Sequence, residues 1–155
     1  MFALAALMMT ACSDEEAQAQ TTNQENMTQK IYLTIGNQTR PATLVSNSAT
    51  EALVAALSES DITYDANDYG GFEKVGSLGH LLPTSNSNTT TAPGDIILYN
   101  GNQIVLFYGS NTWSYTRLGR IEYDSIEQLK SFLKAGQGRV SVTLSLADPS
   151  AINTV

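Results

Sequence analysis

The stretch Gly94–Ile121 constrains the fold of this chain most, because two apolar runs and five aromatic residues occur there around a tight-turn dipeptide. The runs Ile96–Tyr99 and Ile104–Tyr108 flank Asn100-Gly101, which readily adopts the positive φ angles of a hairpin turn. We therefore expect a β-hairpin. Since the apolar runs are continuous rather than alternating, both faces of its strands should be largely covered, as in a barrel or a sheet packed under helices.

Two strands and a helix are expected before this stretch. In Lys30–Ile35 the aliphatic residues alternate with Tyr and Thr, which is the pattern of a strand with one buried face. Gly36-Asn37 provides a turn, and Thr39–Val45 runs back as a second strand. Ser48 and Glu51 match a capping box, in which each side chain satisfies a backbone N–H of the first turn, so a helix should begin at Ser48.

The middle of the chain is more polar and its signals are weaker. Ser60–Asp65 is expected to form a short strand, and Asp68–Gly71 a loop. Thr84–Thr91 is rich in Ser, Thr and Asn. That composition favours an exposed loop.

The last third of the chain returns to regular patterns. Trp113–Ile121 is expected to be a strand, and Asp124 followed by Glu127 indicates a second helix start. We expect this helix to end at Gly136. Arg139–Leu146 alternates apolar and polar residues, as a final half-buried strand does. The order of elements predicts an α+β fold in which strands predominate.

The N-terminus is typical of a targeting segment. Residues 1–11 are almost wholly apolar, too short to span a membrane, and end in small residues before Cys12, the sole cysteine. This pattern resembles a bacterial lipobox, which implies cleavage before Cys12 and a lipid on its sulfur. We therefore expect a lipoprotein signal segment at 1–11 and a membrane anchor in the bacterial cell envelope.

The residues after Cys12 set the remaining domain boundaries. Residues 12–29 are polar and contain no aromatic residue, so they should form a flexible tether behind the lipidated cysteine. Their acidic start, Ser13–Glu16, resembles the signal that sends some bacterial lipoproteins to the outer membrane and cell surface. We expect one folded domain at 30–148 and a short C-terminal tail at 149–155.

The charge distribution argues against a nucleic-acid partner. The formal net charge is −7, and the residues before Lys30 include four acidic side chains and no basic one. The rest of the chain is only mildly acidic. A nucleic-acid-binding protein needs a basic face that neutralises several phosphates, and none is indicated.

A series of short motifs runs through the folded region. They are Ala42-Thr43-Leu44, Glu73-Lys74, Leu82-Pro83, Gly94-Asp95 with Leu98-Tyr99, Leu106-Phe107-Tyr108 and Leu118-Gly119-Arg120-Ile121. In this order they resemble the bacterial cyclophilin-like proteins, from about Lys30 to Leu146. The resemblance implies a closed eight-stranded β-barrel, plugged at its two ends by the helices near Ser48 and Asp124.

Cyclophilins proper are prolyl isomerases, and part of their site has counterparts here. Gln103, Phe107, Trp113 and Tyr115 follow the order of the glutamine and aromatic residues around the cyclophilin groove. The cyclophilin arginine that donates toward the amide nitrogen of proline has none, because no arginine lies between residues 58 and 79. Loss of one charge-assisted hydrogen bond removes about 1.5 to 3 kcal/mol, or about ten- to 150-fold in rate.

The resemblance therefore implies a module that binds a peptide or small ligand without efficient catalysis, and we assign no catalytic residue. The alternative is a weak peptidyl-prolyl cis-trans isomerase of the cell envelope. The expected ligand groove consists of Glu73, Gln103, Phe107, Trp113, Tyr115 and Arg117. For Phe107 core packing is the stronger interpretation, and for Trp113 and Tyr115 packing competes evenly with a place in the groove.

The two arginines near the end of the motif series lie an odd number of residues apart. Arg117 and Arg120 should therefore face opposite sides of their strand, so that at most one lines a given surface. A surface ion pair with Glu73 or Glu122 is the competing interpretation for either arginine.

Other enzyme classes do not match the residue inventory. Cys12 is assigned to the lipid and His80 stands alone, which argues against a Cys-His nucleophile pair and against a zinc site. Residues 65–73 begin like a calcium loop, but Gly76 stands where the bidentate glutamate is needed, so a solvated turn is favoured. We expect no metal ion and no cofactor.

Overall fold

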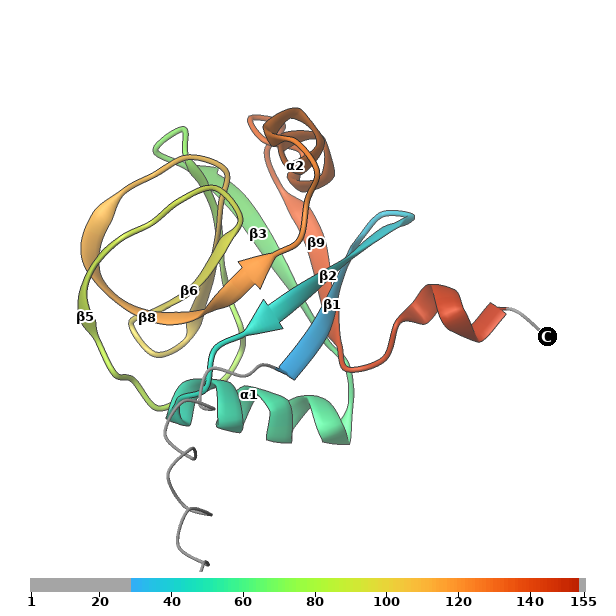
Figure 1. Cartoon of the computed structure of the whole chain (residues 1–155), viewed down its shortest axis with the longest axis horizontal. Coiled ribbons are helices and arrows are strands. Elements are labelled where there is room, and N and C mark those ends of the chain that lie inside the picture. The colour runs from blue at the N-terminus through green and yellow to red at the C-terminus, as the bar shows by residue number, and fades with distance from the viewer. Residues whose placement is uncertain (1–28, 154–155) are drawn as a thin grey trace, which may run out of the picture.

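The folded part of the chain is built around one curved antiparallel sheet (Figure 1). The computed structural model describes residues 29–153. The strands are β1 (Gln29–Ile35), β2 (Gln38–Leu44), β3 (Ile62–Tyr69), β4 (Glu73–Ser77), β5 (Ser87–Thr90), β6 (Asp95–Tyr99), β7 (Gln103–Phe107), β8 (Thr112–Ile121) and β9 (Val140–Ser145). The helices are α1 (Ser48–Glu59), α2 (Ile126–Leu133) and the short 3-10 helix η3 (Pro149–Asn153).

Pairing of β2 with β8 closes the sheet into a barrel. The strand order is β2-β1-β9-β3-β4-β7-β6-β8-β5, with β2 also hydrogen-bonded to β8. Gly119 of β8 lies opposite Leu44, and a Cβ atom there would stand 2.2 Å from the carbonyl oxygen of Thr43. A glycine is therefore required where the barrel closes. The predicted closed eight-stranded barrel is confirmed, with β5 as one extra strand on β8.

The two α-helices lie at opposite ends of the barrel (Figure 1). Leu53 and Leu57 of α1 are buried, as are Leu129 and Leu133 of α2, and all four belong to the same apolar cluster as the barrel interior. Each helix thus covers one end of the core with its apolar stripe. This is the arrangement that the resemblance implies.

Helix α1 begins at Ser48 as predicted, but the capping residue of each helix lies one position away from the predicted one. Asn47, rather than Ser48, caps α1: its side chain accepts a hydrogen bond from the Thr50 backbone N–H at 2.9 Å. Asn47 is an equally good cap, and its amide also donates to the carbonyl oxygen of Arg117 at 2.8 Å, which ties the helix to β8. In α2 the cap is Ser125, where Asp124 was expected.

Three further boundaries differ from the prediction. The loop expected at Asp68–Gly71 is partly strand, because β3 continues to Tyr69 and turns through two glycines with positive φ. The loop expected at Thr84–Thr91 contains β5, which pairs with β8 although its side chains are mostly exposed, so no apolar alternation reveals it. Helix α2 ends at Leu133 rather than Gly136, because Lys134 adopts a left-handed conformation with φ 53°.

The predicted hairpin is confirmed, and its strands separate two apolar clusters. Asn100-Gly101 takes positive φ angles of 53° and 75°, and β6 and β7 pair on either side. Alternate residues, such as Ile96 and Leu106, join the main core inside the barrel. The residues between them, such as Ile97 and Val105, form a second cluster on the opposite face. Both faces are covered, as the continuous apolar runs predict.

The signal segment, Cys12 and nearly all of the tether predicted at 12–29 lie outside the described residues, as does the end of the predicted C-terminal tail. Within residues 29–153, no helix is long and apolar enough to cross a membrane.

Candidate functional site

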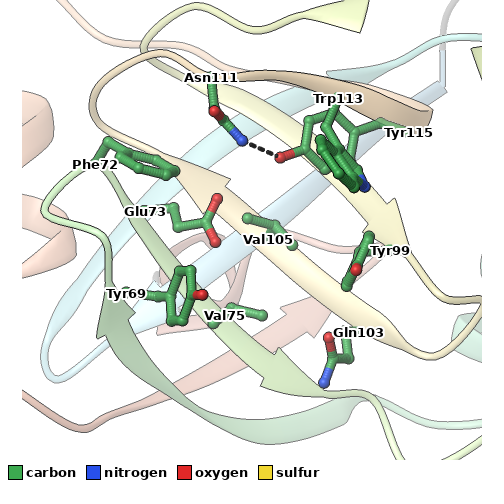
Figure 2. A pocket seen from close by; sticks show the side chains of 10 residues that line it. All are labelled: Tyr69, Phe72, Glu73, Val75, Tyr99, Gln103, Val105, Asn111, Trp113 and Tyr115. Carbon is green, nitrogen blue, oxygen red and sulfur yellow. Dashed lines mark hydrogen bonds between the residues drawn. The ribbon is translucent and has the colours of Figure 1, made fainter. Parts of the chain in front are cut away.

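A cavity of about 450 Å³ lies beside the second apolar cluster, on the face of the sheet opposite the main core. Figure 2 shows the side chains around it. The lining residues are Tyr69, Phe72, Glu73, Val75, Tyr99, Gln103, Val105, Asn111, Trp113 and Tyr115. They come from β3, β4, β6, β7, β8 and the connecting turns. We call this cavity the aromatic pocket.

Strand alternation directs every second residue of β4 toward the aromatic pocket. Glu73 lies opposite Phe107 of β7, and Val75 lies opposite Val105. Lys74, between them, points to the other face and is fully buried there. A slip of one residue in β4 would replace a carboxyl group in the pocket by an ammonium group. The register of this strand therefore sets the charge of the site.

Phe107 lies beneath the aromatic pocket and supports its walls. Its side chain is fully buried, stacks on Phe72 with ring centroids 6.1 Å apart, and meets Tyr115 edge-on at 5.8 Å. The carbonyl oxygen of Phe72 accepts hydrogen bonds from the backbone N–H groups of Tyr108 and Gly109, each at 2.9 Å. These contacts fix the turn before β4 against the end of β7.

The walls and the rim of the pocket differ in exposure. Tyr115 is buried in the wall; its hydroxyl accepts a hydrogen bond from Asn111 Nδ2 at 2.8 Å, and its ring meets Tyr99 edge-on at 6.1 Å. Tyr69 and Trp113 line the same cavity but are 65% and 57% exposed. The pocket thus has an ordered inner wall and large aromatic side chains open to solvent at its rim.

Glu73 is the sole charged residue among the described residues that line the aromatic pocket. It is 7% exposed, and its Oε2 is buried without a hydrogen-bond partner in the described part of the chain. Figure 2 shows the carboxyl group directed into the space between the rings. Burial raises the pKa of Glu73 to about 7, because the charged form loses its hydration. Near neutral pH this carboxyl group accepts or releases a proton readily.

Arg117, predicted for the groove, does not line the aromatic pocket. Its Nη1 lies 3.1 Å from Asp95 Oδ2, and Arg120 Nη2 lies 3.0 Å from Asp95 Oδ1. Asp95 is fully buried and is held by both arginines. The competing interpretation of an ion pair is thus correct for both residues, but the partner is neither Glu73 nor Glu122.

The prediction that the two arginines face opposite sides of their strand is wrong, because β8 contains a β-bulge. The register of β6 against β8 shifts between Ile96 and Ile97, which leaves Leu118 as an extra residue. An extra residue reverses the alternation beyond it. Arg117 and Arg120 therefore reach the same carboxylate from one side.

The structure brings together four of the six predicted groove residues. Glu73, Gln103, Trp113 and Tyr115 line the aromatic pocket, whereas Phe107 lies beneath it and Arg117 lies outside it. The lining residues that the sequence analysis missed are Tyr69, Phe72, Val75, Tyr99, Val105 and Asn111. Alternation from Gln103 identifies Val105, and the hairpin register identifies Tyr99. No periodic signal identifies Phe72 or Asn111, which lie in turns.

No group of three or more His, Cys, Asp or Glu side chains within 29–153 is placed to hold a metal ion. The segment that begins like a calcium loop forms the hairpin of β3 and β4, where Asp68 contacts Lys74 instead.

Comparisons with known proteins agree with this fold. A family model described as a cyclophilin-like family matches residues 33–145, which confirms the resemblance indicated by the motifs. The solution structure of a hypothetical protein from Archaeoglobus fulgidus superposes with a TM-score of 0.58 and 17% sequence identity, over 81% of this chain and 99% of that one. At this identity the likeness shows the fold alone. No curated protein is recognisably similar in sequence.

Proposed function

Because the chain belongs to the cyclophilin-like family, we propose that it is a binding module that holds a peptide or small ligand in the aromatic pocket. The observation that carries the proposal is the exposure of Trp113 and Tyr69 at the mouth of a cavity whose inner wall is ordered. Preformed, mostly apolar cavities of about 300 to 1,000 Å³ are typical of small-molecule sites. A ligand would also cover apolar surface that the fold leaves exposed.

The electrostatics of the pocket favour binding over efficient isomerisation. Rotation about a prolyl bond has a barrier of about 18 to 20 kcal/mol, which a donor toward the amide nitrogen lowers. Neither an arginine nor a lysine is among the described residues that line the pocket, and Arg117 is engaged by Asp95. The alternative, a weak prolyl isomerase, has support from the aromatic walls and from Gln103, which lies in the pocket as the resemblance implies.

The ligand would be met at the cell envelope, since we also propose that Cys12 carries a lipid anchor. The support is the apolar segment before Cys12 and the polar segment after it. Incorporation of labelled fatty acid by the full-length chain, but not by a Cys12→Ser variant, is expected. Equal labelling of both proteins, or of neither, would overturn this assignment.

The binding proposal is tested by titrating the isotopically labelled Cys12→Ser chain with X-Pro peptides and a small-molecule fragment set. Amide shifts are followed on the protein and cis/trans exchange on the peptides. We expect shifts around Glu73, Trp113 and Tyr115, with exchange remaining at the uncatalysed tens of seconds. Faster exchange that Trp113→Ala abolishes would make the protein an isomerase. Complete absence of shifts in the pocket would refute the proposed function.

A further inference from the structure

We infer that the aromatic pocket takes a small organic cation with few or no N–H groups, such as a quaternary or tertiary ammonium compound. Its charge would lie beside the Glu73 carboxylate and its methyl groups against the surrounding rings. The inference rests on the function proposed above and names the ligand chemistry of the same pocket.

The pocket contains an acidic group that no described side chain balances. Glu73 Oε2 has no hydrogen-bond partner there, whereas Asp95 is paired with two arginines and Asp68 with Lys74. A buried carboxylate is stabilised either by a proton or by a nearby cation. A cationic ligand supplies the missing partner, and an anionic ligand is repelled.

Aromatic rings stand around the space in front of this carboxyl group. Figure 2 shows Phe72 on one side of the cavity and Tyr99, Trp113 and Tyr115 on the other. The face of an aromatic ring attracts a cation whose centre lies within about 6 Å of the ring centroid, and such cages bind quaternary ammonium groups. The rings and the carboxylate therefore favour the same class of ligand.

Among the described residues of the lining, Glu73 is the one charged hydrogen-bond acceptor, and this selects among cations. Besides Glu73, the acceptors of the lining are neutral: the amide oxygens of Gln103 and Asn111 and the tyrosine hydroxyls, of which that of Tyr115 already accepts a hydrogen bond from Asn111. A guanidinium carries five N–H donors and a primary ammonium three. Each donor left without an acceptor in the pocket costs about 1 to 3 kcal/mol. A quaternary ammonium carries none.

The size of the cavity favours a free small molecule as the source of this cation. Its volume of about 450 Å³ lies within the range of small-molecule sites. A methylated lysine side chain of a protein carries the same chemical group, so a peptide that contains trimethyllysine is included in the test.

Glu73 is also the group that makes binding depend on pH. The other titratable side chains that face it are the phenols of Tyr69 on β3, Tyr99 on β6 and Tyr115 on β8, with Tyr108 beyond the end of β7. Burial raises the pKa of Tyr115, and raises that of Tyr108 to about 12. Between about pH 6 and about pH 8, ionisation of Glu73 should therefore raise the affinity for a cation about tenfold.

The test uses the fluorescence of Trp113, the sole tryptophan, in the full-length protein. Choline is compared with 3,3-dimethyl-1-butanol, a neutral analogue in which carbon replaces the charged nitrogen. At about pH 8 we expect choline to bind about tenfold more tightly than the alcohol, and to lose about tenfold in affinity at about pH 6. In a Glu73→Gln variant the affinity for choline should fall about tenfold at about pH 8 and no longer change with pH, while the affinity for the alcohol stays unchanged. Glu122→Gln, at an exposed carboxylate paired with Lys30, should leave choline binding unchanged.

Each other outcome has a definite meaning. Equal binding of choline and the alcohol by the unmodified protein overturns the cation inference but leaves the pocket as a binding site. No fluorescence change with choline also overturns it, and the peptide and fragment titration then decides the proposed function separately. Tighter binding of the trimethyllysine peptide than of choline overturns the small-molecule source. The pH dependence of the unmodified protein keeps the inference testable if Glu73→Gln does not fold.

Discussion

Two carboxylates of the β3–β4 hairpin face opposite sides of the sheet, Asp68 with the main core and Glu73 with the aromatic pocket. Asp68 accepts hydrogen bonds from the backbone N–H groups of Gly136 and Gly138, at 3.0 and 2.8 Å, and from Tyr108 at 2.8 Å. It also pairs with buried Lys74 at 3.0 Å. Burial alone would raise the pKa of Asp68, but these bonds outweigh it and hold the pKa well below its usual range.

Glu73 receives none of this support. Its Oε2 has no partner in the described part of the chain, and burial raises its pKa to about 7. Asp95, fully buried beneath Arg117 and Arg120, resembles Asp68 in this respect. The fold thus satisfies the carboxylates that join its elements and leaves unsatisfied the one that faces a cavity. A buried carboxyl group without a partner that faces a cavity supports the proposal that the aromatic pocket binds a ligand.

The largest expected loss of stability follows from removing Asp68, the well-paired carboxylate. Asp68→Ala leaves the Lys74 ammonium buried without its counter-charge and frees two backbone N–H groups. We expect a loss of about 3 to 5 kcal/mol in the free energy of unfolding, measured by urea denaturation. Asp65→Ala, at an exposed pair with Arg139, is the control and should cost at most about 1 kcal/mol. Equal losses in the two variants would show that the Asp68 contacts do not stabilise the fold.

The ion pairs of Asp95 test whether two partners on one carboxylate are redundant. Arg117→Ala or Arg120→Ala alone leaves the other arginine in place, so each should cost about 1 kcal/mol. The double variant leaves a buried, unpaired carboxylate and should cost about 3 kcal/mol or more. The measurement is a double-mutant cycle of unfolding free energies. If the loss in the double variant equals the sum of the two single losses, the two arginines stabilise Asp95 independently and neither substitutes for the other.

These ion pairs also show where prediction from the sequence ends. The hairpin, the closed barrel and the helices at its ends follow from apolar periodicity, turn residues and the motif series, because those signals are local or shared by a family. The bulge at Leu118 leaves no local signal, yet it reverses the direction of every side chain beyond it in β8. It is Arg120 that changes face, so both arginines reach Asp95, and this ion pair holds Arg117 outside the aromatic pocket.

Only part of the aromatic pocket could be predicted from the sequence, namely the residues that belong to the motif series or carry the family resemblance. Gln103, Trp113 and Tyr115 carry the resemblance, and Glu73 belongs to one of its motifs. Phe72 and Asn111 enter the pocket from turns, whose direction depends on long-range hydrogen bonds such as those accepted by the Phe72 carbonyl oxygen. Such contacts become visible only in the folded chain.

Glu73, the carboxyl group without a partner, should make the stability of the fold depend on pH, and Glu73→Gln should remove that dependence. The folded pKa of Glu73, about 7, exceeds the unfolded value of about 4.3. Its contribution to stability is therefore fully present below about pH 4.3 and is lost as the pH rises through about 7. Relative to Glu73→Gln, the unmodified protein should lose about 1 to 2 kcal/mol between about pH 5 and about pH 8, a figure discounted for water that reaches the cavity.

This pH dependence is measured as the difference between the urea midpoints of the two proteins. Glu122→Gln is the matched control, because hydrogen bonding to Lys30 lowers the pKa of Glu122 instead. The control should show no loss of stability over the same interval. A flat difference between the unmodified protein and Glu73→Gln would mean that Glu73 is solvated in the folded state.

The smallest effect on stability, paired with a large effect on binding, is expected at the rim of the aromatic pocket. Trp113 is 57% exposed, so Trp113→Ala should change the unfolding free energy by no more than about 0.5 kcal/mol. A ring that covers a desolvated cation contributes up to about 2 kcal/mol, so the same substitution should weaken choline binding about tenfold or more. Calorimetry measures both quantities, because the substitution removes the fluorophore.

The control is Leu81→Ala, at a 75% exposed apolar residue outside the pocket, which should change neither the unfolding free energy nor choline binding. If Trp113→Ala lowers the unfolding free energy as much as the binding free energy, Trp113 serves the stability of the fold, and Glu73 is left as the residue that supports a binding site.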